Sequence, residues 1–334
     1  MARRGGWRRR GSRGRFRFRD ARGHEIADDA SLERIASLAI PPAWRDVWIS
    51  PHAGARLQAT GVDAAGRTQY LYHPDYRASR ERAKFDRLIR FGERLPGLRE
   101  AMAAHADDQG SRDWTCATAV RVINLAWFRV GSERSARTAR TYGVTTLGKR
   151  HVQVRGSRIS FRFAAKGRMS VRTTLADEEL AAAFRSLLEL PGARLFRYEG
   201  DERLVNLTAP VLNDYLGLHL GDGFTAKDFR TWGGTLLAAI ALAERGPPEN
   251  ASDARRVVAA VMRRVGEQLG NTAAVARASY VSPAVVEQYV EGRTLESFRP
   301  RRLRVIGARS TGLDAEEQAL LSLLRSHRLR RARR

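Results

Sequence analysis

The segment GFTAKDFRTWGGTLLAAIALAER, residues 223–245, contains both the start of a helix and the apolar run that would bury it. Thr225 and Asp228 have the spacing of a capping box, and Phe224 and Phe229 occupy the flanking positions of a hydrophobic staple. These signals predict that the helix begins directly after Thr225. The apolar run that follows predicts that the rest of the helix is buried in the core.

Lys227 and Arg230 lie three residues apart and therefore on one side of this helix, within its first turns. Backbone N–H groups and the helix dipole already favour an anion at that end. Two cations held there predict a phosphate site. The alternative is an ordinary capped helix on the surface with solvated charges.

The regions before this helix divide by periodicity. Residues 20–80 have the pattern of a short helix, a Pro-Pro break and several strands, and the pattern becomes helical after them. Residues 118–134 predict a buried helix that Gly131 ends, so that Arg129 falls in its last turn. Residues 151–175 predict a three-stranded antiparallel meander.

Lys166 lies in the second turn of that meander, and the chain is predicted to be helical from Asp177 to about residue 295. The fold class is therefore α+β, with a small N-terminal mixed domain and a larger, mainly helical domain that contains a three-stranded antiparallel sheet. We expect four parts: a basic disordered arm at 1–19, the small domain at 20–80, the larger domain at 81–310 and a basic C-terminal tail at 311–334.

The chain of 334 residues is strongly basic, with 60 Lys and Arg against 36 Asp and Glu and a formal net charge of +24. Residues 1–19 contain nine arginines and no acid, and residues 325–334 contain six more arginines. Without those 15 arginines the remainder still has 45 basic residues against 36 acidic ones. Such a charge favours a polyanionic partner, and nucleic acid fits better than a membrane because no amphipathic helix accompanies the arms.

The single cysteine, Cys116, excludes an internal disulfide and a zinc site built from cysteines. No apolar segment approaches the ~20 residues of a membrane span, and the N-terminal arginines are not followed by an apolar stretch, so we expect no secretion signal. The seven histidines are scattered, and no phosphate-binding loop of the GxxxxGK type occurs. We expect a cytoplasmic, nucleoid-associated protein that requires neither metal nor another cofactor.

Several candidate residues become informative as an ordered set: Arg129, Lys166, Lys227-x-x-Arg230, Asn271 and Tyr280. This set resembles the active site of type IB DNA topoisomerases, in particular the short poxvirus-like enzymes of bacteria, which share their catalytic fold with tyrosine recombinases. The stretches that carry the resemblance to the catalytic domain are FRVGSER at 128–134, TYGVTTL at 141–147, AAKG at 164–167, KDFRTWGGT at 227–235 and ARASYVSP at 276–283. PPAWRDVWIS at 41–50 and GRTQYLYHP at 66–74 resemble the family's N-terminal DNA-clamping domain.

The resemblance implies relaxation of supercoiled DNA through a 3′-phosphotyrosyl intermediate, without ATP or metal. Tyr280 would be the nucleophile, Arg129 and Arg230 would bracket the scissile phosphate, and Lys166 would protonate the leaving 5′-oxygen. Asn271 departs from the family, which often has histidine there. An Asn amide can also donate a hydrogen bond to a phosphate oxygen, so we expect activity with a different pH dependence.

The resemblance also implies double-stranded DNA as the partner, with one chain enclosing the duplex and no protein partner required. Lys227, Gln69, Tyr70 and Tyr72 are the candidate DNA-binding residues outside the catalytic set. Tyr70 and Tyr72 alternate along a strand and so share one face, which could lie in a DNA groove or pack in the small domain's core.

Two other functions fit the same residues. A tyrosine site-specific recombinase has the same catalytic fold, although recombinases usually have histidine where this chain has Lys227. A catalytically weak nucleoid-binding protein is the non-enzymatic alternative, and Asn271 gives it some support. The complete set of cations and the tyrosine favours the topoisomerase.

Overall fold

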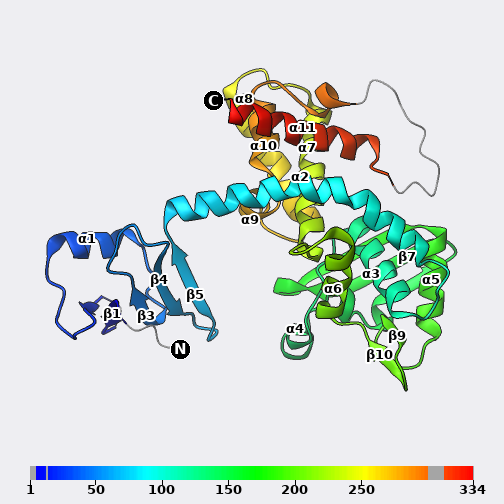
Figure 1. Cartoon of the computed structure of the whole chain (residues 1–334), viewed down its shortest axis with the longest axis horizontal. Coiled ribbons are helices and arrows are strands. Elements are labelled where there is room, and N and C mark those ends of the chain that lie inside the picture. Colours follow the sequence, from blue (N-terminus) through cyan, green and yellow to red (C-terminus); the bar gives the residue numbers. More distant parts are fainter. Residues whose placement is uncertain (1–4, 13, 300–311, 334) are drawn as a thin grey trace. The chain divides into compact units, whose positions relative to one another are not determined.

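The computed structural model describes residues 5–12, 14–299 and 312–333. The chain divides into two compact units, Met1–Phe85 and Asp86–Arg334, and the division falls within the long helix α2 (Pro74–Ala104). Figure 1 shows the order of the elements along the chain. The mixed α+β class predicted from the sequence is confirmed.

Within the described residues, the first unit is built on a five-stranded antiparallel sheet of order β2-β1-β3-β4-β5, with one helix, α1 (Asp29–Ser37). The strands are β1 (Trp7–Arg10), β2 (Arg17–Arg19), β3 (Arg45–Ile49), β4 (Leu57–Val62) and β5 (Thr68–Tyr72). One face of the sheet packs on α1 and forms this unit's core from Ile35, Val47, Ile49 and Ala59.

The prediction that residues 1–19 form a disordered arm is wrong for the residues of β1 and β2. Trp7 and Phe18 pack against the core, so every second residue of these two strands faces inward. Arg8, Arg10, Arg17 and Arg19 occupy the outer face of the sheet, whereas Arg9 pairs with Phe18 on the inner face. The prediction relied on the run of like charge and overlooked the alternation of aromatic and basic residues in β2; residues 1–4 and 13 lie outside the described part.

The second unit contains a three-stranded antiparallel sheet, β6-β7-β8, as far as the structure describes it. The strands are β6 (Val152–Arg155), β7 (Arg158–Ala165) and β8 (Met169–Ala176), so the predicted meander is confirmed. The helices α3 (Arg112–Ala126) and α5 (Glu178–Glu189) pack on this sheet. Phe128, Phe161, Phe163, Phe184 and Phe196 form a connected aromatic cluster between them.

The remaining helices of the second unit, apart from α2, lie mostly in the C-terminal half of the chain. They are α4 (Glu133–Thr138), α6 (Ala209–Leu220), α7 (Ala226–Arg245), α8 (Ala251–Gln268), α9 (Ala273–Ser279), α10 (Pro283–Val290) and α11 (Ala315–Ala332). Short 3-10 turns occur at Val144–Thr146, Lys149–His151, Lys166–Arg168 and Leu295–Phe298. No described helix is long and apolar enough to cross a membrane.

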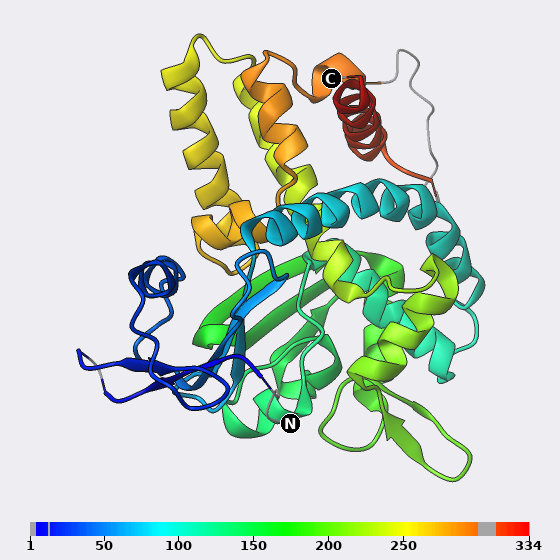
Figure 2. The same cartoon turned by 60° about the vertical axis from the view of Figure 1, so that its left-hand side comes forward.

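Three further predictions are corrected here. The region after Asp177 is not helical throughout, because β9 (Arg197–Glu199) and β10 (Leu204–Asn206) form a hairpin that projects from the unit in Figure 2. The helix α3 ends at Ala126 rather than at Gly131, because Trp127 adopts the left-handed conformation with φ 51°.

The predicted C-terminal tail is largely the helix α11, which packs against α7 and α10 (Figure 1). Its N-terminal half buries apolar side chains, among them Leu320, Leu323 and Leu324, while the arginines lie near its end. Burial of these leucines outweighs the repulsion among the terminal charges. The predicted boundary at residues 310 and 311 lies outside the described residues.

Candidate active site

The start of α7 has the local structure that the sequence predicts. The Asp228 carboxylate accepts hydrogen bonds from the backbone N–H of Thr225 at 2.8 Å and from its hydroxyl at 3.2 Å. Arg87 of α2 donates to the same carboxylate at 2.5 Å. The rings of Phe224 and Phe229 both pack on Phe91 of α2, with centroids 5.9 and 5.0 Å away. The first turn of α7 is therefore held from both sides.

Arg230 is a buried cation, with only 4% of its surface exposed. Its guanidinium donates to the Trp127 carbonyl and, at 2.6 Å, to the Leu269 carbonyl. Its Nε atom is also buried, and none of the described residues accepts a hydrogen bond from it. Burial, followed by the charge of Arg129, lowers the pKa of Arg230 from its ordinary value. Because an unpaired buried donor is costly, such a cation is suited to receive an anion.

Two adjacent glycines let α7 approach the rest of the site closely. A Cβ at Gly233 would overlap the indole of Trp127, and a Cβ at Gly234 would lie 3.0 Å from the Cβ of Tyr280. The buried hydroxyl of Thr235, one residue later, lies 2.7 Å from the Thr231 carbonyl and 3.1 Å from the Tyr280 carbonyl, and it accepts from the backbone N–H of Ser282 at 3.1 Å. The sequence WGGT therefore lets the backbone of Tyr280 lie directly against α7, the helix that carries Arg230.

Arg129 lies after α3, not in its last turn as predicted, because α3 ends three residues earlier. Phe128 anchors this segment between Phe161 and Phe163 of β7. The Arg129 carbonyl accepts from the backbone N–H of Val144 at 2.9 Å. A catalytic side chain on this segment would be held on a rigid base.

Asn271 joins the two arginines. Its Oδ1 accepts from Nη2 of Arg129 at 2.8 Å, and its Nδ2 donates at 3.1 Å to the Leu269 carbonyl, which also accepts from Arg230. Arg129 Nη2 lies 3.2 Å from the Gly270 carbonyl as well. The loop at residues 269–271 therefore holds both guanidinium groups.

Tyr280 is the C-cap residue of α9 and is half-buried. The guanidinium carbon of Arg230 lies 5.0 Å from the centre of its ring. Burial acts to raise the pKa of the phenol, but the neighbouring cations outweigh it and bring the pKa below its ordinary value of 10.0. Those cations are Arg230, Arg129 and Lys227. The predicted start of the next helix, with Ser282 as N-cap and Pro283 as first residue, is confirmed.

The two predicted lysines are both exposed. Lys227 lies near enough to Tyr280 to affect the pKa of its phenol. Lys166 lies at the turn between β7 and β8, and its side chain makes no hydrogen bond or ion pair with other described residues. The same hairpin reaches the site through Met169, since a Cβ at Gly270 would lie 3.8 Å from both Met169 Sδ and Arg129 Nη1. The structure does not bring Lys166 itself into contact with the other catalytic candidates.

The predicted DNA-binding residues of the first unit separate onto two faces. Tyr70 and Tyr72 are 50% and 38% exposed and stack with centroids 6.2 Å apart, which excludes the alternative that they pack in the core. Gln69 lies on the opposite face and donates to Asp63 at 2.8 Å. It therefore does not join the two tyrosines, because successive residues of a strand point to opposite faces.

Tyr70 ends a row of paired residues on the outer face of the sheet. The row crosses all the strands of the sheet through consecutive antiparallel pairs. A groove of about 1030 Å³ on this unit is lined by Arg8, Arg10, Trp48 and Tyr70 among others. We call the row the outer row; its members are Arg19, Arg8, Trp48, Thr60 and Tyr70.

Comparison with known proteins agrees with this geometry. Residues 73–295 match the family described as eukaryotic DNA topoisomerase I, catalytic core, and residues 15–63 match the family described as bacterial DNA topoisomerase IB, N-terminal domain. The chain is 30% identical over 275 residues to DNA topoisomerase 1B of Acanthamoeba polyphaga mimivirus, which covers 80% of this chain and 82% of that protein. The chain belongs to the type IB DNA topoisomerase family. It is an isomerase that acts on DNA.

Several residues of this topoisomerase site are not apparent from the motifs alone. The backbone carbonyls of Trp127 and Leu269 hold Arg230. The pair of glycines in α7 could have indicated the contact with Trp127, because a glycine inside a helix indicates a close neighbour. The arginines of β1 were assigned to a disordered arm, and the sequence of this strand, Trp-Arg-Arg-Arg, has no alternation that would have indicated a strand. Strand β1 precedes the matched N-terminal domain, which begins at residue 15.

Proposed function

We propose that this type IB topoisomerase cuts and reseals one DNA strand through Tyr280. The contact between Arg230 and the Tyr280 ring, at 5.0 Å, is the observation that carries the proposal. Tyr280 loses its proton more readily than a free phenol, because the cations around it lower its pKa. The proton of Tyr280 passes to solvent water, the phenolate oxygen attacks the phosphorus to form a bond from phosphorus to Oη, and the bond from phosphorus to the 5′-oxygen breaks.

Arg129 and Arg230 bind the non-bridging oxygens, where negative charge increases in the transition state. Arginine suits this role because its planar group stays charged and can hold two oxygens. Such positioned donors contribute on the order of 10²–10³ in rate each. Asn271 supports this role by holding Arg129 in place, and its remaining amide hydrogen is available to a phosphate oxygen.

Lys166 is the proposed general acid for the leaving 5′-oxygen. The exposed position of Lys166 at the tip of the β7–β8 hairpin supports this role, because its ammonium group has no hydrogen bond or ion pair with the described residues and is available to a bound duplex. Proton donation of this kind is worth about 10²–10⁴ in rate. Resealing is the reverse: the 5′-hydroxyl returns its proton to Lys166 and attacks the phosphotyrosine, so that no ATP is consumed. The cations take the place of a metal ion.

The outer row of the small unit is the proposed duplex-binding surface. Exposed Tyr70 and Tyr72 supply aromatic faces, and the arginines on the outer face of β1 and β2 supply phosphate-binding cations. One chain holds the whole catalytic set, so we propose that a monomer is sufficient. The net charge of +24 supports residence on the nucleoid.

Plasmid relaxation tests this function. Purified protein should relax supercoiled plasmid in EDTA without ATP, whereas Tyr280→Phe should leave the plasmid supercoiled. A requirement for ATP or Mg²⁺, or equal relaxation by both proteins, would contradict the proposal.

A further inference from the structure

Helix α11 places a buried glutamate, Glu317, beside the N-terminal turns of α7. It lies beyond residue 295, where the match to the catalytic core of the family ends, and it packs on α7 and α10. Its residue Glu317 is only 4% exposed, although its side chain is a carboxylate. A buried carboxylate is retained at a cost unless its hydrogen bonds are satisfied, so its partners indicate what it does.

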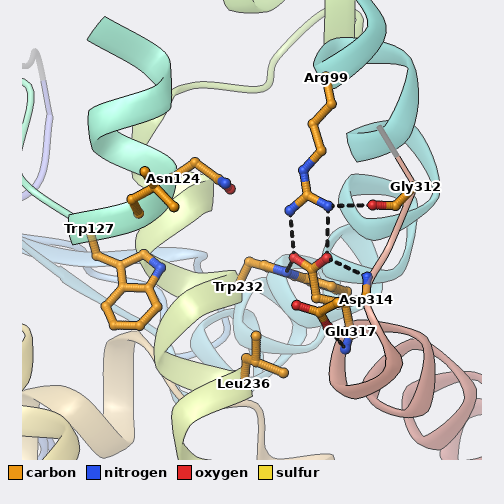
Figure 3. Close-up of a pocket in the computed structure, with 9 residues that line it drawn as sticks. Arg99, Asn124, Trp127, Trp232, Leu236, Gly312, Asp314 and Glu317 are labelled. Carbon is orange, nitrogen blue, oxygen red and sulfur yellow. Dashed lines mark hydrogen bonds and ion pairs between the residues drawn. The ribbon is translucent and has the colours of Figure 1, made fainter. Parts of the chain in front are cut away.

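The Glu317 carboxylate connects three helices, as Figure 3 shows. Arg99 of α2 binds it with both terminal nitrogens, at 2.8 and 2.7 Å. The indole N–H of Trp232 in α7 donates to it at 3.2 Å, and so does the backbone N–H of Asp314. Both carboxylate oxygens are therefore occupied, and α2, α7 and α11 meet at one side chain.

Trp232 is buried, with only 2% of its surface exposed. A Cβ at Gly92 of α2 would overlap its ring, and the Phe91 ring lies 6.0 Å from it. A cavity of about 460 Å³ is lined by Trp232, Trp127 and Leu236 (Figure 3). Beside this cavity, the hydrogen bond from the Trp232 indole to Glu317 is a polar contact that orients the ring, in addition to its packing on α2.

Trp232 follows Arg230 by two residues, and Trp127 supplies a carbonyl that holds the Arg230 guanidinium. Both tryptophans line the same cavity, so a shift of Trp232 would move the first turns of α7 relative to Trp127. We propose that Glu317 is a positioning residue for Arg230: it acts through Trp232 and sets the register between α7 and the segment after α3. The proposal rests on the function proposed above for Arg230.

Single-turnover cleavage of a saturating DNA substrate separates positioning from stability. The amplitude reports the fraction of folded enzyme, whereas the rate constant reports the geometry of the active site. We expect Glu317→Ala to lower the rate constant about tenfold or more, since a misplacement of about 1 Å can cost up to 10²-fold. Glu317→Gln should retain part of the rate, because its amide oxygen can still accept from Trp232.

Glu93→Gln is the matched control. Glu93 of α2 pairs with Arg325 of α11 at 2.7 Å, so it joins the same two helices through a similar but more exposed ion pair. The rate constant of this variant should equal that of the wild type. Trp232→Phe removes the indole N–H, and combining it with Glu317→Ala should slow cleavage no further than Glu317→Ala alone, because both changes break one connection.

A Glu317→Ala enzyme that cleaves at the wild-type rate with a lower amplitude or melting temperature would overturn the positioning role while leaving the proposed function intact. Independent, multiplicative effects of Glu317→Ala and Trp232→Phe would overturn the route through Trp232. A wild-type enzyme that forms no covalent complex with DNA would overturn the proposed function, and this inference with it.

Discussion

Asn271 accepts a hydrogen bond from Arg129, with 2.8 Å between Oδ1 and Nη2. Its amide nitrogen meanwhile donates to the Leu269 carbonyl. An uncharged amide can accept from one partner and donate to another at every pH, whereas an imidazolium can only donate. In this enzyme the residue at this position therefore orients an arginine, whatever further contact it makes with phosphate.

This arrangement predicts the pH behaviour of Asn271→His. The variant should lose cleavage rate as the pH falls through about 6.5, because protonated histidine can no longer accept from Arg129 and repels it. The wild type should show no such step there. Single-turnover cleavage rates measured from pH 5 to pH 9 test this; a variant that becomes faster in acid would mean that the site uses an imidazolium charge.

A second prediction concerns Tyr280, the proposed nucleophile. Because nearby cations lower the pKa of Tyr280, the cleavage rate should rise with pH and level off below pH 10.0. Lys227→Gln removes one of these cations, so the midpoint of the rise should move to higher pH. The rate profile against pH measures the shift. An unchanged midpoint would show that Lys227 has no influence on the phenol.

Measurements of unfolding free energy can test the close contact between Gly233 of α7 and the Trp127 indole. Alanine is intrinsically better than glycine in a helix by about 1 kcal/mol, yet a Cβ at Gly233 would overlap Trp127. We expect Gly233→Ala to lower the free energy of unfolding by about 1–2 kcal/mol, the usual cost of overpacking. Urea unfolding measures it.

Gly217→Ala is the control for that experiment, because nothing lies within 4 Å of a Cβ at Gly217 in α6. It should raise the free energy of unfolding by about 0.5–1 kcal/mol. Equal stabilisation by both substitutions would contradict the close contact between α7 and Trp127.

The arginines of β1 lie on two different faces of the sheet, and substitutions on the two faces should have opposite effects. Arg8 belongs to the outer row and Arg10 points to the same side, so replacing both with Gln should reduce the salt dependence of DNA binding by about 0.9 in slope per lost phosphate contact. Arg9 instead donates to the Trp44 carbonyl at 2.5 Å. Arg9→Gln should lower the melting temperature and leave the slope unchanged. Identical slopes for all three proteins would exclude the outer row as a DNA contact.

Local signals predicted the parts of the fold that local interactions decide. The capping box at Thr225, the Ser282-Pro283 helix start and the turn at Lys166 all depend on residues close in sequence. The end of α3 was missed because a tryptophan, not a glycine, adopts the left-handed conformation there. Packing of Trp127 against α7 offsets the cost of its left-handed conformation. Local sequence rarely reveals a conformation that depends on such a distant contact.

Long-range pairing explains the remaining differences. Glu317 and Arg99 are 218 residues apart, and nothing near either residue indicates that the other neutralises it. The C-terminal charges were given more weight than the leucines among them, so α11 was taken for a tail. The proposed catalytic set could be assembled from the sequence because its residues follow one another in the order of the family's motifs. The carbonyls that hold Arg230 belong to the backbone and do not depend on residue type, so the sequence does not reveal them.

The linkage between protein and DNA is the most direct test of the central claim. The enzyme should be incubated in EDTA with a DNA substrate that cannot be resealed, digested with protease and analysed by mass spectrometry together with the state of the DNA ends. The account predicts a peptide joined through Tyr280 to a 3′-phosphate, a free 5′-hydroxyl on the other fragment, and no adduct with Tyr280→Phe. An adduct on another residue, a link to the 5′-end, or cleavage without an adduct would contradict it.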